Sequence, residues 1–98
     1  MVHSFTVGRD IAGVVLEKGA NITHFKEGDR VFGCGESGAL AQFAVCNENK
    51  IALIPDDSIA MEDIVGMGLA GCTALQSILW FYKKEELHNK SVLVIGGS

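Results

Sequence analysis

The sequence predicts a mixed chain in which short strands come first, helices follow, and one buried strand opens a glycine turn at the end. Short apolar runs separated by glycine turns fill residues 11–54. An uncharged stretch with helical spacing then covers residues 64–82. Finally, the continuous apolar run 91–95 leads directly into glycines, which is typical of a parallel strand buried on both faces. Such a strand needs partners, and none follows, so we predict that the chain is truncated.

The β-rich part divides at its glycines and at Pro55. Strands are expected at residues 11–16, 30–32, 39–46 and 50–54. Gly13 would permit another backbone to approach the first strand closely. Gly19–Asn21 and Phe25–Asp29 read as turns, and Gly28 is expected to supply a positive φ. Pro55 stops the last of these strands because it lacks an N–H group.

The helical part begins after Pro55. Residues 56–58, Asp-Asp-Ser, offer side-chain oxygens that can cap a helix. Two helical pieces are expected at residues 61–67 and 73–82, broken by the glycines between them. On the second piece Leu75, Leu79 and Tyr82 are spaced to share one face.

The uncharged stretch 64–82 has 19 residues, close to the length that crosses a bilayer. Its glycines and the central Gln76 weaken both membrane insertion and helix formation, so we predict that the stretch is buried in a protein core and does not span a membrane. The N-terminus lacks the basic and apolar regions of a signal peptide.

Composition excludes several classes of function. The net charge is −4 with no basic cluster, which argues against nucleic acid as a partner. Cys34, Cys46 and Cys72 are scattered and odd in number, which argues against a disulfide framework and for a reducing compartment. No CxxC pair is present to build a thiolate metal site.

The terminal residues 92–98 are the best candidate for a site. A strand followed by glycines is how a dinucleotide-binding fold presents backbone N–H groups to a pyrophosphate, although such glycines more often form a plain turn. Arg9 and Asp10 could bind an anion, but we expect them to form a solvated ion pair with each other. Cys72 is expected to be a small buried thiol. His3, His24 and His88 are expected to be solvated surface residues.

Six segments, in order, resemble the medium-chain dehydrogenase/reductase superfamily, closest to its zinc-free quinone oxidoreductase branch. They are residues 8–15, 25–33, 38–43, 54–56, 69–74 and 91–98. The Gly-Arg-Asp opening is most similar to the mitochondrial reticulon-interacting oxidoreductases of this branch. The resemblance implies part of a GroES-like β-domain at residues 1–60. It implies the opening helix and strand of a truncated Rossmann α/β domain at residues 61–98.

The resemblance also implies where a metal would bind in zinc-using relatives. They carry a histidine where this sequence has Arg9 and a cysteine where it has Leu69. Neither side chain can ligate zinc, because a ligand needs a lone pair and arginine stays protonated. No metal is therefore expected.

The resemblance implies an NADPH-dependent enzyme that transfers hydride to a quinone or an α,β-unsaturated carbonyl. Thr73 would lie near the nicotinamide, and Gly96, Gly97 and Ser98 would cradle the pyrophosphate. Leu40 stands where relatives usually have an aromatic residue of the substrate wall. No catalytic residue is identified. A small-molecule substrate, a homodimeric longer protein, no membrane partner and a cytoplasmic location are expected, with a mitochondrial one as the alternative.

Other functions stay open. The 98 residues could act as a non-catalytic interaction or assembly fragment. They could belong to the enoyl reductase of a polyketide or fatty-acid synthase, or to a small membrane protein that spans residues 64–82. Alone, the chain is expected to be inactive, because the cradle stops before the helix that would complete it.

Overall fold

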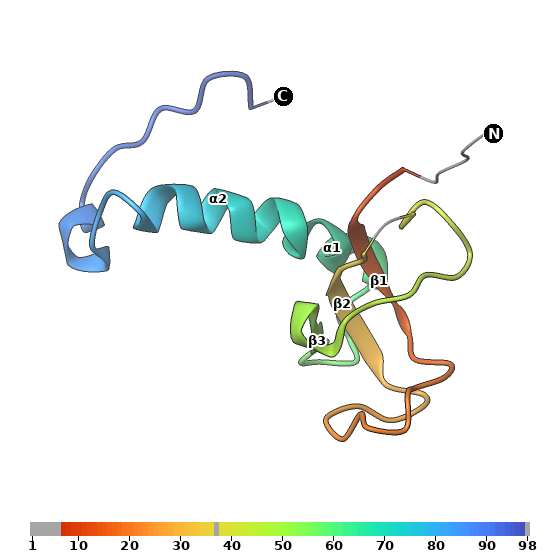
Figure 1. Cartoon of the computed structure of the whole chain (residues 1–98). Helices are drawn as coiled ribbons and strands as arrows, with labels where there is room; N and C mark the ends of the chain where they lie inside the picture. Colours follow the sequence, from red (N-terminus) through yellow and green to blue (C-terminus); the bar gives the residue numbers. More distant parts are fainter. Residues whose placement is uncertain (1–6, 37, 98) are drawn as a thin grey trace.

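The computed structural model describes residues 7–36 and 38–97, and Figure 1 shows a small sheet from which a helical arm extends. The sheet is antiparallel with the order β1-β2-β3. It consists of β1 (Asp10–Val14), β2 (Arg30–Cys34) and β3 (Ile51–Leu53), and the 3-10 turn η1 (Glu48–Lys50) precedes β3. The strands predicted at residues 11–16, 30–32 and 50–54 are confirmed, although their ends differ from the prediction by up to two residues.

The turn between β1 and β2 follows the local chemistry expected from the sequence. Gly28 has a φ of 91°, a conformation that costs little without a Cβ atom, so this prediction is confirmed. Its N–H donates to the Val15 carbonyl at 2.8 Å. The Lys26 N–H donates to the Asp29 carboxylate at 2.9 Å. These bonds close the hairpin and set the register in which Asp10 faces Cys34.

The predicted strand at residues 39–46 is wrong. The segment is irregular, and the Glu36 N–H bonds the Val45 carbonyl at a long 3.4 Å. Leu40, Phe43 and Val45 are 75%, 72% and 80% exposed. The described part of the chain provides no strand to pair along this segment, so its alternating pattern has no sheet to join.

The helical part has four short elements: α1 (Met61–Ile64), the 3-10 turn η2 (Val65–Met67), α2 (Leu69–Leu79) and the 3-10 turn η3 (Lys84–Leu87). The predicted cap at residues 56–58 is wrong, because Ala60 precedes α1 without a side-chain cap. Asp56 instead accepts the Ser58 N–H at 2.8 Å in a local turn. The second helix also begins four residues earlier than expected, since Gly71 is tolerated within α2.

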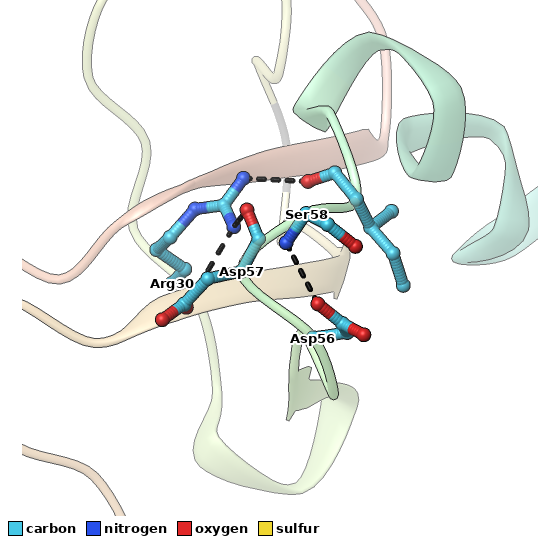
Figure 2. Close-up of polar contacts among 5 residues, drawn as sticks. Arg30, Asp56, Asp57 and Ser58 are labelled. Carbon is cyan, nitrogen blue, oxygen red and sulfur yellow. Dashed lines mark hydrogen bonds and ion pairs between the residues drawn. The ribbon is translucent and has the colours of Figure 1, made fainter.

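Arg30 ties the sheet to the segment that leads into α1. Its guanidinium donates to the carbonyls of Asp57 at 3.1 Å and Ile59 at 2.7 Å. It also lies 3.9 Å from the Asp57 carboxylate, which is fully solvated. Figure 2 shows Arg30 reaching across from β2 to this segment, beside the separate Asp56–Ser58 turn. A guanidinium suits this role because its planar fork can bond two carbonyls at once.

The core is small and lies where the sheet meets α1. Its apolar members are Val31, Ile54 and Ile64, with exposed fractions of 5%, 7% and 8%. By contrast, α2 contains no buried residue. Leu75 and Tyr82 are 57% and 56% exposed. The buried-core prediction for residues 64–82 is therefore wrong along α2, because this helix packs mainly against the adjacent η2 turn and leaves its side chains exposed.

The predicted buried strand at residues 91–95 is also wrong. These residues have no regular structure, and the exposed fractions of Val92 to Ile95 run from 66% to 89%. A buried strand exists only between neighbours, and the described residues place none beside it. Among the described residues, no helix is long and apolar enough to cross a membrane.

Candidate functional site

The side chain of Asp10 joins the start of β1 to the start of α2. Its Oδ1 accepts hydrogen bonds from the backbone N–H of Leu69 at 2.5 Å and of Ala70 at 3.3 Å. The first N–H groups of a helix have no partner within the helix, and the helix dipole favours a negative charge there. The solvated Arg9–Asp10 ion pair preferred from the sequence is thus wrong, since the Asp10 carboxylate caps α2 instead.

Beside this cap, the backbone of β2 meets the residue that precedes α2. A Cβ atom at Gly68 would collide with the Gly33 carbonyl, and one at Gly33 would collide with the Lys50 carbonyl. Both glycines are buried. At Gly13, where close approach was predicted, no atom lies within 4 Å of the place that a Cβ atom would take, so that prediction is wrong. The close crossing belongs to Gly33 and Gly68 instead.

Thr73 lies one helical turn beyond the cap. Its hydroxyl donates to the Leu69 carbonyl at 2.7 Å, which fixes the side-chain rotamer. The residue is exposed. Because the hydroxyl proton is used in this bond, the Thr73 oxygen keeps lone pairs that can accept a hydrogen bond from a ligand.

The glycine turn predicted to hold a pyrophosphate lies in the exposed C-terminal segment. Gly96 has a φ of 77°, which favours glycine, and a Cβ atom at Gly97 would contact Val94 at 3.1 Å. Ser98 lies outside the described residues. Within residues 7–36 and 38–97, no hydrogen bond links Thr73 to Gly96 or Gly97. Their shared role therefore stays a prediction.

A hollow of about 920 Å³ runs along β1 and is covered on one side by the irregular segment 39–46. Ile11, Val15 and Phe43 are among the apolar residues that line it. Glu48 also lines it, and its Oε2 atom is buried without a hydrogen-bond partner among the described residues. β1 thus forms one wall of an open hollow.

Cys46 lines the same hollow, and burial raises the pKa of its thiol above the ordinary value. Electrostatic interactions with Cys34 and Glu36 raise this pKa further. Cys72, predicted to be buried, is exposed on α2. Its thiol points to the Met67 carbonyl at 3.8 Å. In the described ranges 7–36 and 38–97, no three potential metal-ligating side chains gather.

The sequence matches the family model of the alcohol dehydrogenase GroES-like domain over residues 2–56. The chain belongs to this family. The antiparallel sheet at residues 10–53 accords with the GroES-like β-domain expected for the first part. No solved structure matches the chain.

Curated relatives place this GroES-like chain within the medium-chain dehydrogenase/reductase superfamily, near the quinone oxidoreductases. It is 44% identical over 75 residues to a trans-enoyl reductase of Gibberella fujikuroi, covering 68% of this chain and 21% of that protein. It is 30% identical over 97 residues to the mitochondrial NAD(P)H oxidoreductase RTN4IP1 of Danio rerio, covering 94% and 25%. It is 32% identical over 95 residues to the quinone oxidoreductase of Mus musculus, covering 96% and 28%. The chain spans about a quarter of the length of these relatives.

The structure brings Arg9 and Leu69, which the sequence resemblance predicts to replace zinc ligands of relatives, to the same junction. Arg9 precedes the capping Asp10, and Leu69 supplies the capped N–H group. Arg9 is exposed, and its carbonyl accepts the Gly35 N–H at 2.7 Å. Sequence reasoning missed the role of Asp10. The available signal was Gly68, which precedes α2 and has no side chain that could cap it.

Proposed function

We propose that this GroES-like chain is part of an NADPH-dependent oxidoreductase that transfers hydride to a quinone or an α,β-unsaturated carbonyl. It would contribute the junction between the catalytic domain, with residues 1–60, and a Rossmann domain that begins at residues 61–98. The supporting observation is that similarity to quinone oxidoreductase and RTN4IP1 continues over 95 and 97 residues. It therefore runs through the sheet and α2.

The cofactor proposal rests on Thr73 and on the terminal turn. A bound nicotinamide cofactor would supply the hydride. The Thr73 oxygen can accept a hydrogen bond from a carboxamide N–H, because its own proton is donated to Leu69. Gly96 has the positive φ that turns backbone N–H groups toward an anion, and Gly97 and Ser98 would continue the cradle. Orientation and exclusion of water are the contributions that we assign to the protein.

We propose that the enzyme works without zinc. The donor set at the junction does not suit the metal, since Arg9 has no free lone pair and Leu69 has no donor atom. The exposed guanidinium of Arg9 adds a positive charge near the site, which would further disfavour a cation. We also keep the expectation of a homodimer that acts on a small molecule, in the cytoplasm or, like RTN4IP1, in mitochondria.

A second substrate class is favoured by one specific observation. The trans-enoyl reductase of Gibberella fujikuroi is 44% identical to this chain over 75 residues. Quinones and enones both accept hydride at a carbon conjugated to a carbonyl, so the same junction could serve either. The enoyl reductase reading predicts activity on enoyl thioesters, and flanking synthase domains would support it.

The experiment begins with the genomic sequence on either side of residues 1–98. The longest encoded polypeptide would be purified and assayed for oxidation of NADPH and NADH with a quinone, an enone and an enoyl thioester. We expect saturable NADPH oxidation with at least one acceptor. Absence of turnover with every acceptor, together with a transcript that starts at Met1, would instead favour a non-catalytic interaction fragment.

A further inference from the structure

Asp10 and Thr73 are connected through one residue. The Asp10 carboxylate holds the Leu69 N–H at 2.5 Å, and the Leu69 carbonyl accepts the Thr73 hydroxyl at 2.7 Å. The chain separation between Asp10 and Leu69 is 59 residues, so this is a tertiary contact and not a local cap. Any movement of Leu69 relative to β1 would therefore also move Thr73.

A second contact lies beside the cap. Asp10 and Ile11 face Cys34 and Gly33 in the register of β1 and β2. The contact of Gly68 with the Gly33 carbonyl is thus one register position from the Asp10 cap. One contact is steric and the other is electrostatic. Together they fix where α2 starts relative to two adjacent strands.

The rest of α2 offers no alternative anchor. The helix contains no buried residue, and Figure 1 shows it extending away from the sheet beyond its first turn. Hydrophobic packing normally sets the position of a helix, and here it contributes little. The hydrogen bonds from the first N–H groups of α2 to Asp10 therefore largely determine the orientation of the helix.

We infer that Asp10 is a positioning residue that sets the place of Thr73 through the backbone N–H and C=O groups of Leu69. The inference rests on the proposed function for the role of Thr73, but not for the contacts themselves. An aspartate is suited to this role because one short, ionised side chain can accept two helix N–H groups. Asparagine keeps an acceptor oxygen at the same distance and should preserve the geometry. Alanine removes the acceptor.

The test compares Asp10→Ala and Asp10→Asn in the longest polypeptide that contains residues 1–98, labelled with ¹⁵N-leucine and methyl-labelled threonine. The control is Asp56→Ala, which removes a carboxylate that accepts the Ser58 N–H at 2.8 Å but does not reach α2. We expect Asp10→Ala to shift the Leu69 amide and Thr73 methyl signals and to speed exchange of the Leu69 N–H at least tenfold. In Asp10→Asn the NMR signals and the Leu69 exchange rate should stay close to those of the wild type, and Asp56→Ala should leave them unchanged.

Enzyme assays provide the second readout. NADPH oxidation per folded protein should fall at least fivefold in Asp10→Ala and recover to within twofold of wild type in Asp10→Asn. Unchanged Leu69 and Thr73 signals in Asp10→Ala would overturn the inference, and so would equal losses in both Asp10 variants. A wild-type protein without NADPH oxidation would contradict the proposed function, while the spectra would still decide whether Asp10 positions Thr73.

Discussion

At the scale of single residues, the crossing of Gly33 and Gly68 leaves no room for a side chain. We expect Gly68→Ala to lower the free energy of unfolding by about 1–3 kcal/mol, because a methyl group would push α2 away from the Gly33 carbonyl. Gly66→Ala is the control, since a methyl group at Gly66 would meet no atom within 4 Å. Denaturant titration of the longest polypeptide would measure both. Equal losses in the two variants would contradict the steric explanation.

Cys46 and Cys72 are expected to differ in reactivity. Burial, with a smaller electrostatic contribution from neighbouring groups, raises the pKa of Cys46, so less of its reactive thiolate is present at a given pH. Cys72 is exposed on α2. At pH 8, iodoacetamide should therefore label Cys72 several times faster than Cys46, and the ratio should narrow as the pH rises. Mass spectrometry of quenched time points would follow both sites, and faster labelling of Cys46 at pH 8 would contradict the burial.

Arg9 and Leu69 lead to a prediction about metal content. Protein dialysed against buffer without chelator should retain well under one equivalent of zinc, because neither side chain provides a ligand. Elemental analysis by mass spectrometry would measure it. A stoichiometric metal that survives dialysis would show that other residues form a site, and the zinc-free assignment would then fail.

Some residues were predictable because their chemistry acts over a few positions. The Gly28 turn depends on residues 15–29, and its positive φ followed from the local sequence. Asp10 was not predictable in this way. Its partner is 59 residues away, and no local pattern distinguishes a long-range cap from a solvated charge. The glycine crossing was predicted at Gly13 and lies at Gly33 and Gly68, because close approach depends on which backbones meet.

At the scale of elements, Arg30 connects the sheet to the segment before α1. We expect Arg30→Lys to lower the free energy of unfolding by about 1–2 kcal/mol, because an ammonium group cannot donate to the Asp57 and Ile59 carbonyls at the same time. Partial solvation of the site keeps this loss small. Hydrogen exchange should rise at residues 57–61. Lys50→Ala is the control, because its ion pair with Glu36 is 3.7 Å long and exposed, and it should cost less than about 0.5 kcal/mol. Similar losses in the two variants would contradict the proposed anchor.

Elements were predictable where the chain supplies its own partners. The predictions of β1, β2 and β3 were right because each of these strands pairs with another strand within residues 10–53. The segments 39–46 and 91–95 carry strand-like patterns, yet neither forms a strand. An alternating pattern shows which face of a segment is apolar. Whether the segment forms a strand depends on a neighbouring strand with which it can pair. The Rossmann start at residues 61–98 stays a prediction for the same reason.

At the scale of the whole molecule, the chain buries little of its surface. Its accessible surface is 8236 Å², whereas a compact protein of this mass would expose about 5,400 Å². Its radius of gyration is 16.3 Å, against about 13 Å for a compact domain of this length. The apolar residues of α2 and the C-terminal segment account for much of the exposed large hydrophobic surface.

We therefore expect residues 1–98 alone to show no cooperative melting and no reductase turnover. A typical domain stability of about 5–15 kcal/mol depends on apolar burial, and only Val31, Ile54 and Ile64 form the buried apolar core of the described chain. Calorimetry and an NADPH oxidation assay on the purified 98-residue chain would test this. A sharp transition together with saturable NADPH oxidation would show that the chain is a complete minimal enzyme.

The distance along the chain between Asp10 and Leu69 also has a consequence for biosynthesis. Leu69 is added 59 residues after Asp10, which takes about 3–12 s at a ribosomal rate of about 5–20 residues per second. The β1–β2 hairpin can close during this interval, since its contacts lie within residues 10–34. Until Leu69 emerges, the Asp10 carboxylate has no helix to bind. Pausing of translation between β3 and α2 would therefore prolong a state in which the hairpin is formed and its helical arm is unattached.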